Sequence, residues 1–314
     1  MAAWNELVNE LEGQVGEPAK SKWLTDKNQE VLNLISEKRG GKNVIFYSSA
    51  FLQKPHTPPN LIQITHEEIN GLMSVMYRMD WSKGLTLLLH TPGGITNAAE
   101  TIVAYLMSKF DEFEVIIPAF AMSAGTMISL ASNKIIMGRQ SQLGPIDPQL
   151  PIGGRFISAR AIVDQFERAK KEIKEDLKLA HLWAPILQSL GPATLLEAKN
   201  ALDYGERMVA KWLSTRMFQS RKNSVRLANA TAKYFNDAAE HKSHGRRIDR
   251  DEARTQNLHI EDLEDDQGLQ DYVLSAYHLA TITFEKTPVT KMLSSNHAKY
   301  WVKSMPFQQG APVS

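Results

Sequence analysis

The chain contains no cysteine among its 314 residues. This absence excludes disulfides, thiolate metal sites and a cysteine nucleophile. It fits a reducing compartment, and we expect a cytoplasmic location. Long apolar runs are also missing, because no stretch reaches the roughly eighteen consecutive apolar residues of a membrane-spanning helix. Residues 1–12 lack the basic start and the apolar centre of a signal peptide. We therefore expect no membrane span.

An excess of charge of one sign is absent as well. The 36 basic and 35 acidic residues leave a net charge of +1, so neither a nucleic acid partner nor an anionic membrane is indicated. No G-x-G-x-x-G fingerprint follows a predicted strand, and we expect neither a nicotinamide site nor any other cofactor. Apolar residues are abundant instead, at 43% of the chain, enough for one large or two small domains with a sizeable core.

The most informative segment is Ala-Met-Ser-Ala-Gly-Thr at 121–126. It follows an apolar stretch over 115–120 and precedes a helix-like run over 127–132, which places Ser123 at a strand-to-helix turn. Unpaired N–H groups at such a turn can stabilise an oxyanion, and small neighbours let a carbonyl group approach closely. The segment therefore indicates a nucleophile, although serine is also a common helix N-cap.

A glycine pair marks a second strand-to-helix turn. Residues 85–90 are almost continuously apolar and predict a buried strand, which ends in Thr91-Pro92-Gly93-Gly94 before a helix. Glycines at this position let backbone N–H groups approach a ligand. Taken together, the two turns predict a nucleophile beside an oxyanion hole, whereas either turn alone is also compatible with an ordinary loop.

These motifs, together with Gly-Pro-Ile-Asp-Pro-Gln at 144–149, resemble the serine dehydrogenase proteinase family, the ClpP-like serine peptidases of the ClpP/crotonase superfamily. The resemblance continues more weakly from about Val44 to about Ile260. It implies an α/β, ClpP/crotonase-like fold of repeated strand-helix units, here with a large additional helical part. Many relatives carry an N-terminal membrane segment, and this chain departs from them in that respect.

Alternating strand and helix patterns indicate a parallel sheet with crossover helices. Strands are predicted at 43–48, 85–90, 114–118 and 134–137. Helices start at about 65 and 97, where Thr65–Glu68 and Asn97–Glu100 have capping-box spacing. We expect a helical extension over 1–40, a peptidase domain over 41–288 with a helical insertion at about 158–240, and a tail over 289–314. This tail is expected to be poorly ordered or docked on a neighbour. The first helix of the insertion is expected from 158 to about 180.

Ser123 needs a base, because a serine hydroxyl is otherwise a weak nucleophile. Residues 244–253 resemble a segment that the proteinase family carries late in its domain. The resemblance implies a triad in the order Ser123, Asp147, His244, with His244 as the base and Asp147 orienting it. It also implies that N–H groups of Gly93, Gly94 and Ala124 hold the oxyanion. Asp147 could instead be a turn residue between two prolines, and His244 a surface residue.

Other residues compete for these roles. His90 ends a motif strand, and we expect it to order the glycine turn by hydrogen bonding. Resemblance to signal-peptide-peptidase-like relatives would imply a Ser–Lys dyad with the lysine some forty to fifty residues after the serine, a range that includes Lys170, Lys171 and Lys174. These lysines belong, however, to a charge-rich helix that favours a solvated face. His241 and His244 have the spacing of a metal pair, but no third or fourth ligand is evident, so no metal is expected.

The resulting functional hypothesis is a serine peptidase that hydrolyses peptides or unfolded protein segments through an acyl-enzyme. The resemblance implies a homo-oligomer, and no sequence feature shows an unfoldase partner. Two alternatives stay open. One is a crotonase-type acyl-CoA enzyme, although the active loops offer Ser123 and Asp147 rather than glutamates. The other is a catalytically silent scaffold that keeps the fold.

Overall fold

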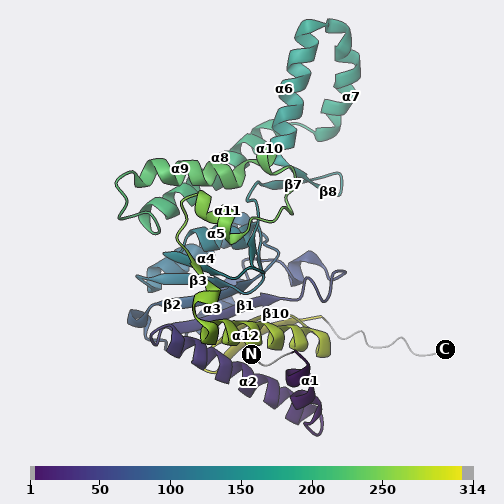
Figure 1. Ribbon diagram of the computed structural model, residues 1–314. Helices are drawn as coiled ribbons and strands as arrows, with labels where there is room; N and C mark the ends of the chain where they lie inside the picture. Colours follow the sequence, from purple (N-terminus) through teal and green to yellow (C-terminus); the bar gives the residue numbers. More distant parts are fainter. Residues whose placement is uncertain (1–3, 306–314) are drawn as a thin grey trace, which may run out of the picture. The chain divides into compact units, whose positions relative to one another are not determined.

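The computed structural model describes residues 4–305 and divides into two compact units (Figure 1). The first, here called the sheet unit, comprises the described residues up to Leu143 and from Asp249 onward. The second, the helical unit, comprises Gly144–Ile248. The predicted helical insertion at about 158–240 falls within the helical unit. The predicted single peptidase domain over 41–288 stays a prediction, and the compact units divide the chain differently.

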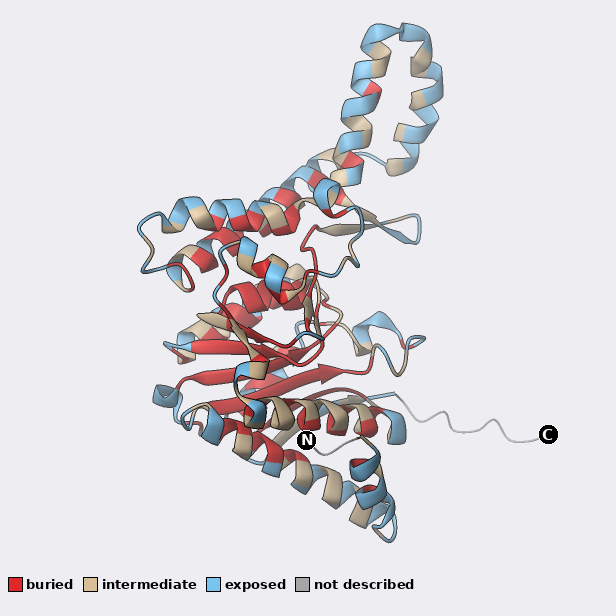
Figure 2. Cartoon of the chain, in the orientation of Figure 1, coloured by how far each residue is buried: buried red, intermediate tan, exposed pale blue. Residues whose placement is uncertain are grey.

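A seven-stranded mixed sheet forms the centre of the sheet unit, with the strand order β11-β10-β1-β2-β3-β5-β9. Its strands are β1 (Asn43–Ser49), β2 (Leu85–His90), β3 (Phe113–Ile117), β5 (Lys134–Met137), β9 (Ile260–Asp262), β10 (Val289–Ser295) and β11 (Lys299–Ser304). The five strands from β1 to β9 are parallel, whereas β10 and β11 add antiparallel pairs at the β1 edge. Figure 2 shows the parallel strands β1, β2, β3 and β5 as largely buried, as expected of parallel strands covered by helices, whereas the edge strands β9 and β11 are mostly only partly buried.

Helices cover both faces of the sheet. One face packs against α1 (Trp4–Glu12), α2 (Glu17–Lys38) and α12 (Gln267–Lys286) through a single apolar cluster. The other face is lined by α3 (Glu68–Val75), α4 (Thr96–Lys109) and α5 (Ala124–Leu130). The unit also contains α11 (Arg250–Thr255) and a parallel pair, β4 (Phe120–Ala121) with β6 (Gln142–Leu143). Crossover helices between parallel strands place the loops that follow β2 and β3 at one sheet edge.

The helical unit begins with an antiparallel hairpin and continues as helices. Its elements are β7 (Gln149–Ile152), β8 (Arg155–Ser158), α6 (Ala159–Glu175), α7 (Ala180–Leu190), α8 (Thr194–Thr215), α9 (Ser224–Asn236) and α10 (Ala238–His241). One small apolar cluster joins α6 to α8 around Ile162 and Leu202, and further buried residues of α8 and α9 include Leu213 and Phe235. Although α7 is mostly apolar, none of its residues is buried (Figure 2).

Most predicted elements are confirmed, with two corrections. The four predicted strands match to within one residue at each end. The long helix expected from 158 to about 180 ends at Glu175, because the Asp176 side chain accepts a hydrogen bond from the Lys178 N–H and opens a separate turn. The prediction of a poorly ordered tail is wrong for 289–304, where β10 pairs with β1 and β11 pairs with β10. Residues 306–314 lie outside the described residues.

Candidate active site

Ser123 sits in a strained turn between β4 and α5. Its backbone angles are φ 51° and ψ −114°, a region that residues with a Cβ rarely adopt. A serine that merely caps a helix accepts a hydrogen bond from an N–H of the first turn. Ser123 makes no such bond. The interpretation of Ser123 as an ordinary N-cap is therefore wrong, and its hydroxyl is not committed to capping α5.

The glycine loop lies directly against this turn. A Cβ atom on Gly93 would lie 2.7 Å from Ser123 Cβ and 2.6 Å from Met122 O, and the φ of Gly93 is 100°. Two backbone hydrogen bonds join the segments, from Thr91 N–H to Phe120 O at 2.9 Å and from Met122 N–H to Thr91 O at 3.1 Å. Only glycine fits at position 93, because both the space and the backbone conformation exclude a side chain.

The N–H groups of this region differ in availability. The Gly93 N–H donates to Thr91 Oγ1 at 3.1 Å, so direct use of this group by an oxyanion would require that bond to open. Within residues 4–305, the N–H groups of Gly94 and Ala124 have no hydrogen-bond partner. The sequence motif predicted three equivalent N–H donors and gave no sign that Thr91, the threonine of the same motif, is the acceptor for Gly93.

His90 does not order the glycine turn as expected. His90 is 1% exposed, and within residues 4–305 neither ring nitrogen has a hydrogen-bond partner. It packs instead among the rings of Phe51, Phe120 and Tyr277, with centroids 4.9 to 5.9 Å away. Burial lowers the pKa of His90 to about 3, so the ring is neutral at physiological pH. The hydrogen bond within the glycine turn comes from Thr91.

The helical unit brings Asp147 and His244 together although 97 positions separate them in the chain. His244 Nδ1 lies 2.8 Å from Asp147 Oδ1, and the other carboxylate oxygen accepts a hydrogen bond from Gln149 Nε2 at 2.7 Å. Asp147 is 2% exposed, whereas the His244 side chain is 32% exposed. An ionised carboxylate accepts hydrogen bonds and donates none, so in the neutral imidazole the hydrogen lies on Nδ1 and the lone pair on Nε2.

Neighbouring contacts hold this pair in place. The Ile146 N–H donates to Phe235 O of α9 at 2.8 Å and so ties the Asp147 segment to the helix that precedes His244. Asp147 and His244 line an open hollow of about 200 Å³ within the helical unit, together with Arg160 and other residues of α6 and of the segment after α10. No partner of His244 Nε2 is present within residues 4–305. The arrangement suits a histidine that accepts a proton through Nε2 while a carboxylate orients its ring.

The competing side chains are placed differently. His241 is 3% exposed, and its ring nitrogens contact Tyr234 O at 2.7 Å and Arg246 Nη1 at 3.0 Å, which gives it a packing role. No group of three or more potential metal ligands occurs within residues 4–305. The lysines at 170, 171 and 174 are exposed on α6. A lysine base needs a desolvated site, and these side chains do not lie in one.

The model of one protein family matches residues 18–187, more than half of the chain. Its description is ClpP-like SDH-type serine proteinase. The chain belongs to this family. The match includes the ClpP-like serine turn at Ser123, the glycine loop and Asp147, and it ends before His244. The expected family and its α/β fold are thereby confirmed, and serine peptidase chemistry is supported at the level of the family.

Similar proteins cover only part of the chain. Two uncharacterized proteins of Methanocaldococcus jannaschii, MJ0137 and MJ1495, are 38% identical over 116 residues and 32% identical over 119 residues. These stretches are 37% and 38% of this chain, and the chain spans about two-fifths of the relatives' length, 39% and 40%. A solved structure, that of a mutant of the 1510-N membrane-bound stomatin-specific protease, is 28% identical with a TM-score of 0.26; the match covers 36% of this chain and 59% of that one.

Within residues 4–305, no helix is both long enough and apolar enough to cross a membrane.

Proposed function

We propose that the protein is a serine peptidase with Ser123 as the nucleophile, His244 as the general base and Asp147 as the residue that orients the imidazole. The observation that carries the proposal is the backbone of Ser123, which is held at positive φ without a capping bond, against a glycine that admits no side chain. Strain of this kind persists where the surroundings enforce it, and it exposes a nucleophile at a strand-to-helix turn.

The proposed reaction passes through an acyl-enzyme. Ser123 Oγ attacks the scissile carbonyl carbon while His244 Nε2 takes the hydroxyl proton. The C–N bond then breaks, and the proton moves from Nε2 to the leaving amine. In the second half, Nε2 removes a proton from water, the resulting hydroxide attacks the ester carbon, and Ser123 Oγ leaves and regains a proton. Asp147 stabilises the imidazolium in both halves.

The oxyanion is proposed to bind the N–H groups of Gly94 and Ala124. Both lack a partner within the described part of the chain, which supports this assignment. Gly93 contributes its lack of a side chain, and its use as a third donor remains a prediction. Donors that are oriented before reaction stabilise developing charge without further reorganisation. Unfolded segments as substrates, homo-oligomeric assembly and a cytoplasmic location also remain predictions.

Labelling by a fluorophosphonate probe, mapped by mass spectrometry, tests the proposal. The wild-type chain should be labelled at Ser123, and Ser123→Ala should lose all labelling. His244→Ala should reduce the labelling rate at least about thousandfold, as expected when a serine loses its base. His181→Ala serves as the matched control, because His181 is an exposed histidine of the same unit.

The lysine alternative is tested in the same assay. Lys171→Ala and Lys174→Ala should label within about twofold of wild type, since both side chains are solvated. Loss of labelling in either lysine variant, with full labelling in His244→Ala, would transfer the base role to the lysine. A wild-type chain that is never labelled and hydrolyses no casein-derived peptide would instead support the silent scaffold.

A further inference from the structure

A lysine and a glutamate form a fully buried ion pair in the sheet unit. Lys291 of β10 is 0% exposed and Glu68, the first residue of α3, is 1% exposed; Nζ lies 2.5 Å from Oε1. Charged side chains are buried this completely only when they are paired. The ammonium group also donates to Gln63 O at 2.9 Å and to Asn60 O at 3.2 Å. All three donors of Lys291 are therefore used to hold residues 60–68 against β10.

The held segment is bonded directly to the glycine loop. The Ile64 N–H donates to Gly93 O at 2.8 Å, and Ile64 O accepts from the Ile95 N–H at 2.9 Å. Ile64 is thus hydrogen-bonded to the residues on both sides of Gly94. The approach is so close that a Cβ atom on Gly94 would lie 2.2 Å from Ile64 O. Any displacement of Ile64 therefore moves the peptide groups of Gly93 and Gly94.

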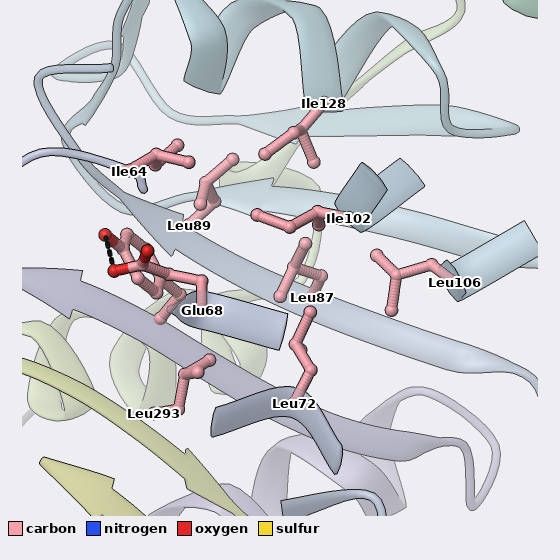
Figure 3. Close-up of a pocket in the computed structure, with 10 residues that line it drawn as sticks. Ile64, Glu68, Leu72, Leu87, Leu89, Ile102, Leu106, Ile128 and Leu293 are labelled. Atoms are coloured by element: carbon pink, nitrogen blue, oxygen red, sulfur yellow. Dashed lines mark hydrogen bonds between the residues drawn. The ribbon is translucent and has the colours of Figure 1, made fainter. Parts of the chain in front are cut away.

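The side chain of Ile64 is anchored as well. It is 1% exposed and lines a small apolar cavity of about 20 Å³ together with Leu89 of β2 and Ile128 of α5 (Figure 3). Glu68 lines the same cavity, and its carboxylate lies 3.5 Å from the Tyr47 hydroxyl. The ion pair, Ile64 and the helix that follows Ser123 therefore belong to one packed region.

We infer that Lys291 is a positioning residue for the oxyanion hole. It touches neither the proposed substrate nor Ser123, and it acts by holding the 60–68 segment whose Ile64 fixes the Gly93–Gly94 loop. This inference rests on the proposed function, because the loop is assigned there as an oxyanion donor. Without the ammonium group, two main-chain carbonyls lose their donor, Ile64 loses its support, and the Gly94 N–H moves out of alignment.

Two variants and a matched control test this role. Lys291→Met removes the ammonium donors but leaves the buried Glu68 carboxylate without its ion-pair partner, so this single variant can fail to fold. The double variant Lys291→Met with Glu68→Gln leaves no unpaired charge, and the glutamine oxygen can still accept the Thr65 N–H, as Glu68 Oε2 does at 2.6 Å. The control is Lys54→Met. Lys54 also clamps two carbonyls, of Thr287 at 2.7 Å and Val289 at 2.6 Å, with no bond to the glycine loop.

The first readout is the fluorophosphonate reaction, with its maximal rate measured separately from probe affinity. The double variant should keep a cooperative thermal transition and most of its affinity for the probe. Its maximal labelling rate should fall about tenfold to hundredfold, as expected for misplaced donors. Lys54→Met should label at the wild-type rate. A folded double variant that labels at the wild-type rate would overturn the positioning role.

The second readout does not depend on activity. Amide hydrogen exchange of Ile64 and Ile95 should become at least about tenfold faster in the double variant, whereas Thr91 and Met122, bonded on the other side of the loop, should keep their protection. Unchanged protection of Ile64 and Ile95 would overturn the inference even if the wild-type chain proves to be unreactive. Faster exchange in an unreactive chain would instead contradict the proposed function and uphold the mechanical role of Lys291.

Discussion

The two units hold their candidate functional groups by different means. In the sheet unit, the main chain places Ser123, through a strained φ, small neighbours and backbone hydrogen bonds to Thr91. In the helical unit, side chains do the placing, because His244 is oriented by a carboxylate from a segment distant in sequence and is a third exposed. The position of Ser123 should therefore be sensitive to a larger side chain in the neighbouring glycine loop. The orientation of His244 should be sensitive to the loss of the Asp147 carboxylate that accepts its hydrogen bond.

The largest effect is expected from Gly93→Ala. The new Cβ would collide with Met122 O and Ser123 Cβ in a backbone conformation that alanine disfavours. We expect the fluorophosphonate labelling rate to fall about thousandfold and the free energy of unfolding to drop by about 2 kcal/mol. Labelling kinetics and urea denaturation measure the two effects. Gly153→Ala is the control for glycine at positive φ, since within the described residues no atom beyond its chain neighbours lies within 4 Å of the position of its Cβ.

A smaller effect on chemistry, without a loss of stability, is expected from Asp147→Asn. The amide can still pair with His244 but favours the wrong tautomer, so Nε2 no longer offers a lone pair. Labelling should slow about hundredfold while the thermal midpoint stays within about 2 °C of wild type, because the substitution is isosteric. A loss of stability in Asp147→Asn as large as that expected for Gly93→Ala would show that the Asp147–His244 pair supports the fold rather than the reaction. The contrast between the two units would then disappear.

The smallest effect concerns acid stability of the sheet unit. Burial lowers the pKa of His90 to about 3, well below its value in an unfolded chain. Below about pH 6.5, His90 is therefore protonated in the unfolded state but neutral in the folded state. The free energy of unfolding consequently decreases as the pH falls. Between pH 7 and 5.5, wild type should lose about 1 kcal/mol more than His90→Phe, measured by urea denaturation at each pH.

Glu114 titrates in a lower window and does not obscure this comparison. Desolvation by burial would raise its pKa, but the hydrogen bonds and charge of Arg39, with support from Thr86 and Lys42, outweigh burial and lower the pKa to about 2. Its contribution is therefore present above about pH 4.5 and is lost only as the pH falls further. Equal slopes for wild type and His90→Phe between pH 7 and 5.5 would contradict the assignment to His90.

Local patterns predicted much of the sheet unit from the sequence. The parallel strands are apolar runs ended by turn residues, so their bounds agree with the structure. Capping patterns were less dependable. Glu68 does bond back to the Thr65 N–H, but the helix expected to be capped at Asn97 starts at Thr96 after Ile95, with no side-chain cap. Backbone contacts from Ile64 to the glycine loop decide that start, and spacing alone does not encode them.

Long-range contacts explain what could not be predicted. β10 contains a lysine and three polar residues, so it does not look like a buried strand, yet its lysine is neutralised by Glu68 far away in sequence. The pairing of Asp147 with His244 was expected only from the family resemblance, because no spacing rule joins residues so distant. The bond from Gln149 to Asp147 was missed, although Gln149 stands in the same motif.

The position of β10 after all three proposed catalytic residues has a consequence for synthesis. A nascent chain carries Ser123, Asp147 and His244 before it carries Lys291. During translation, the proposed reactive groups are thus present while the strand that holds the 60–68 segment does not yet exist. Under the proposed positioning role of Lys291, the order of synthesis therefore separates the acquisition of reactive groups from the acquisition of their geometry.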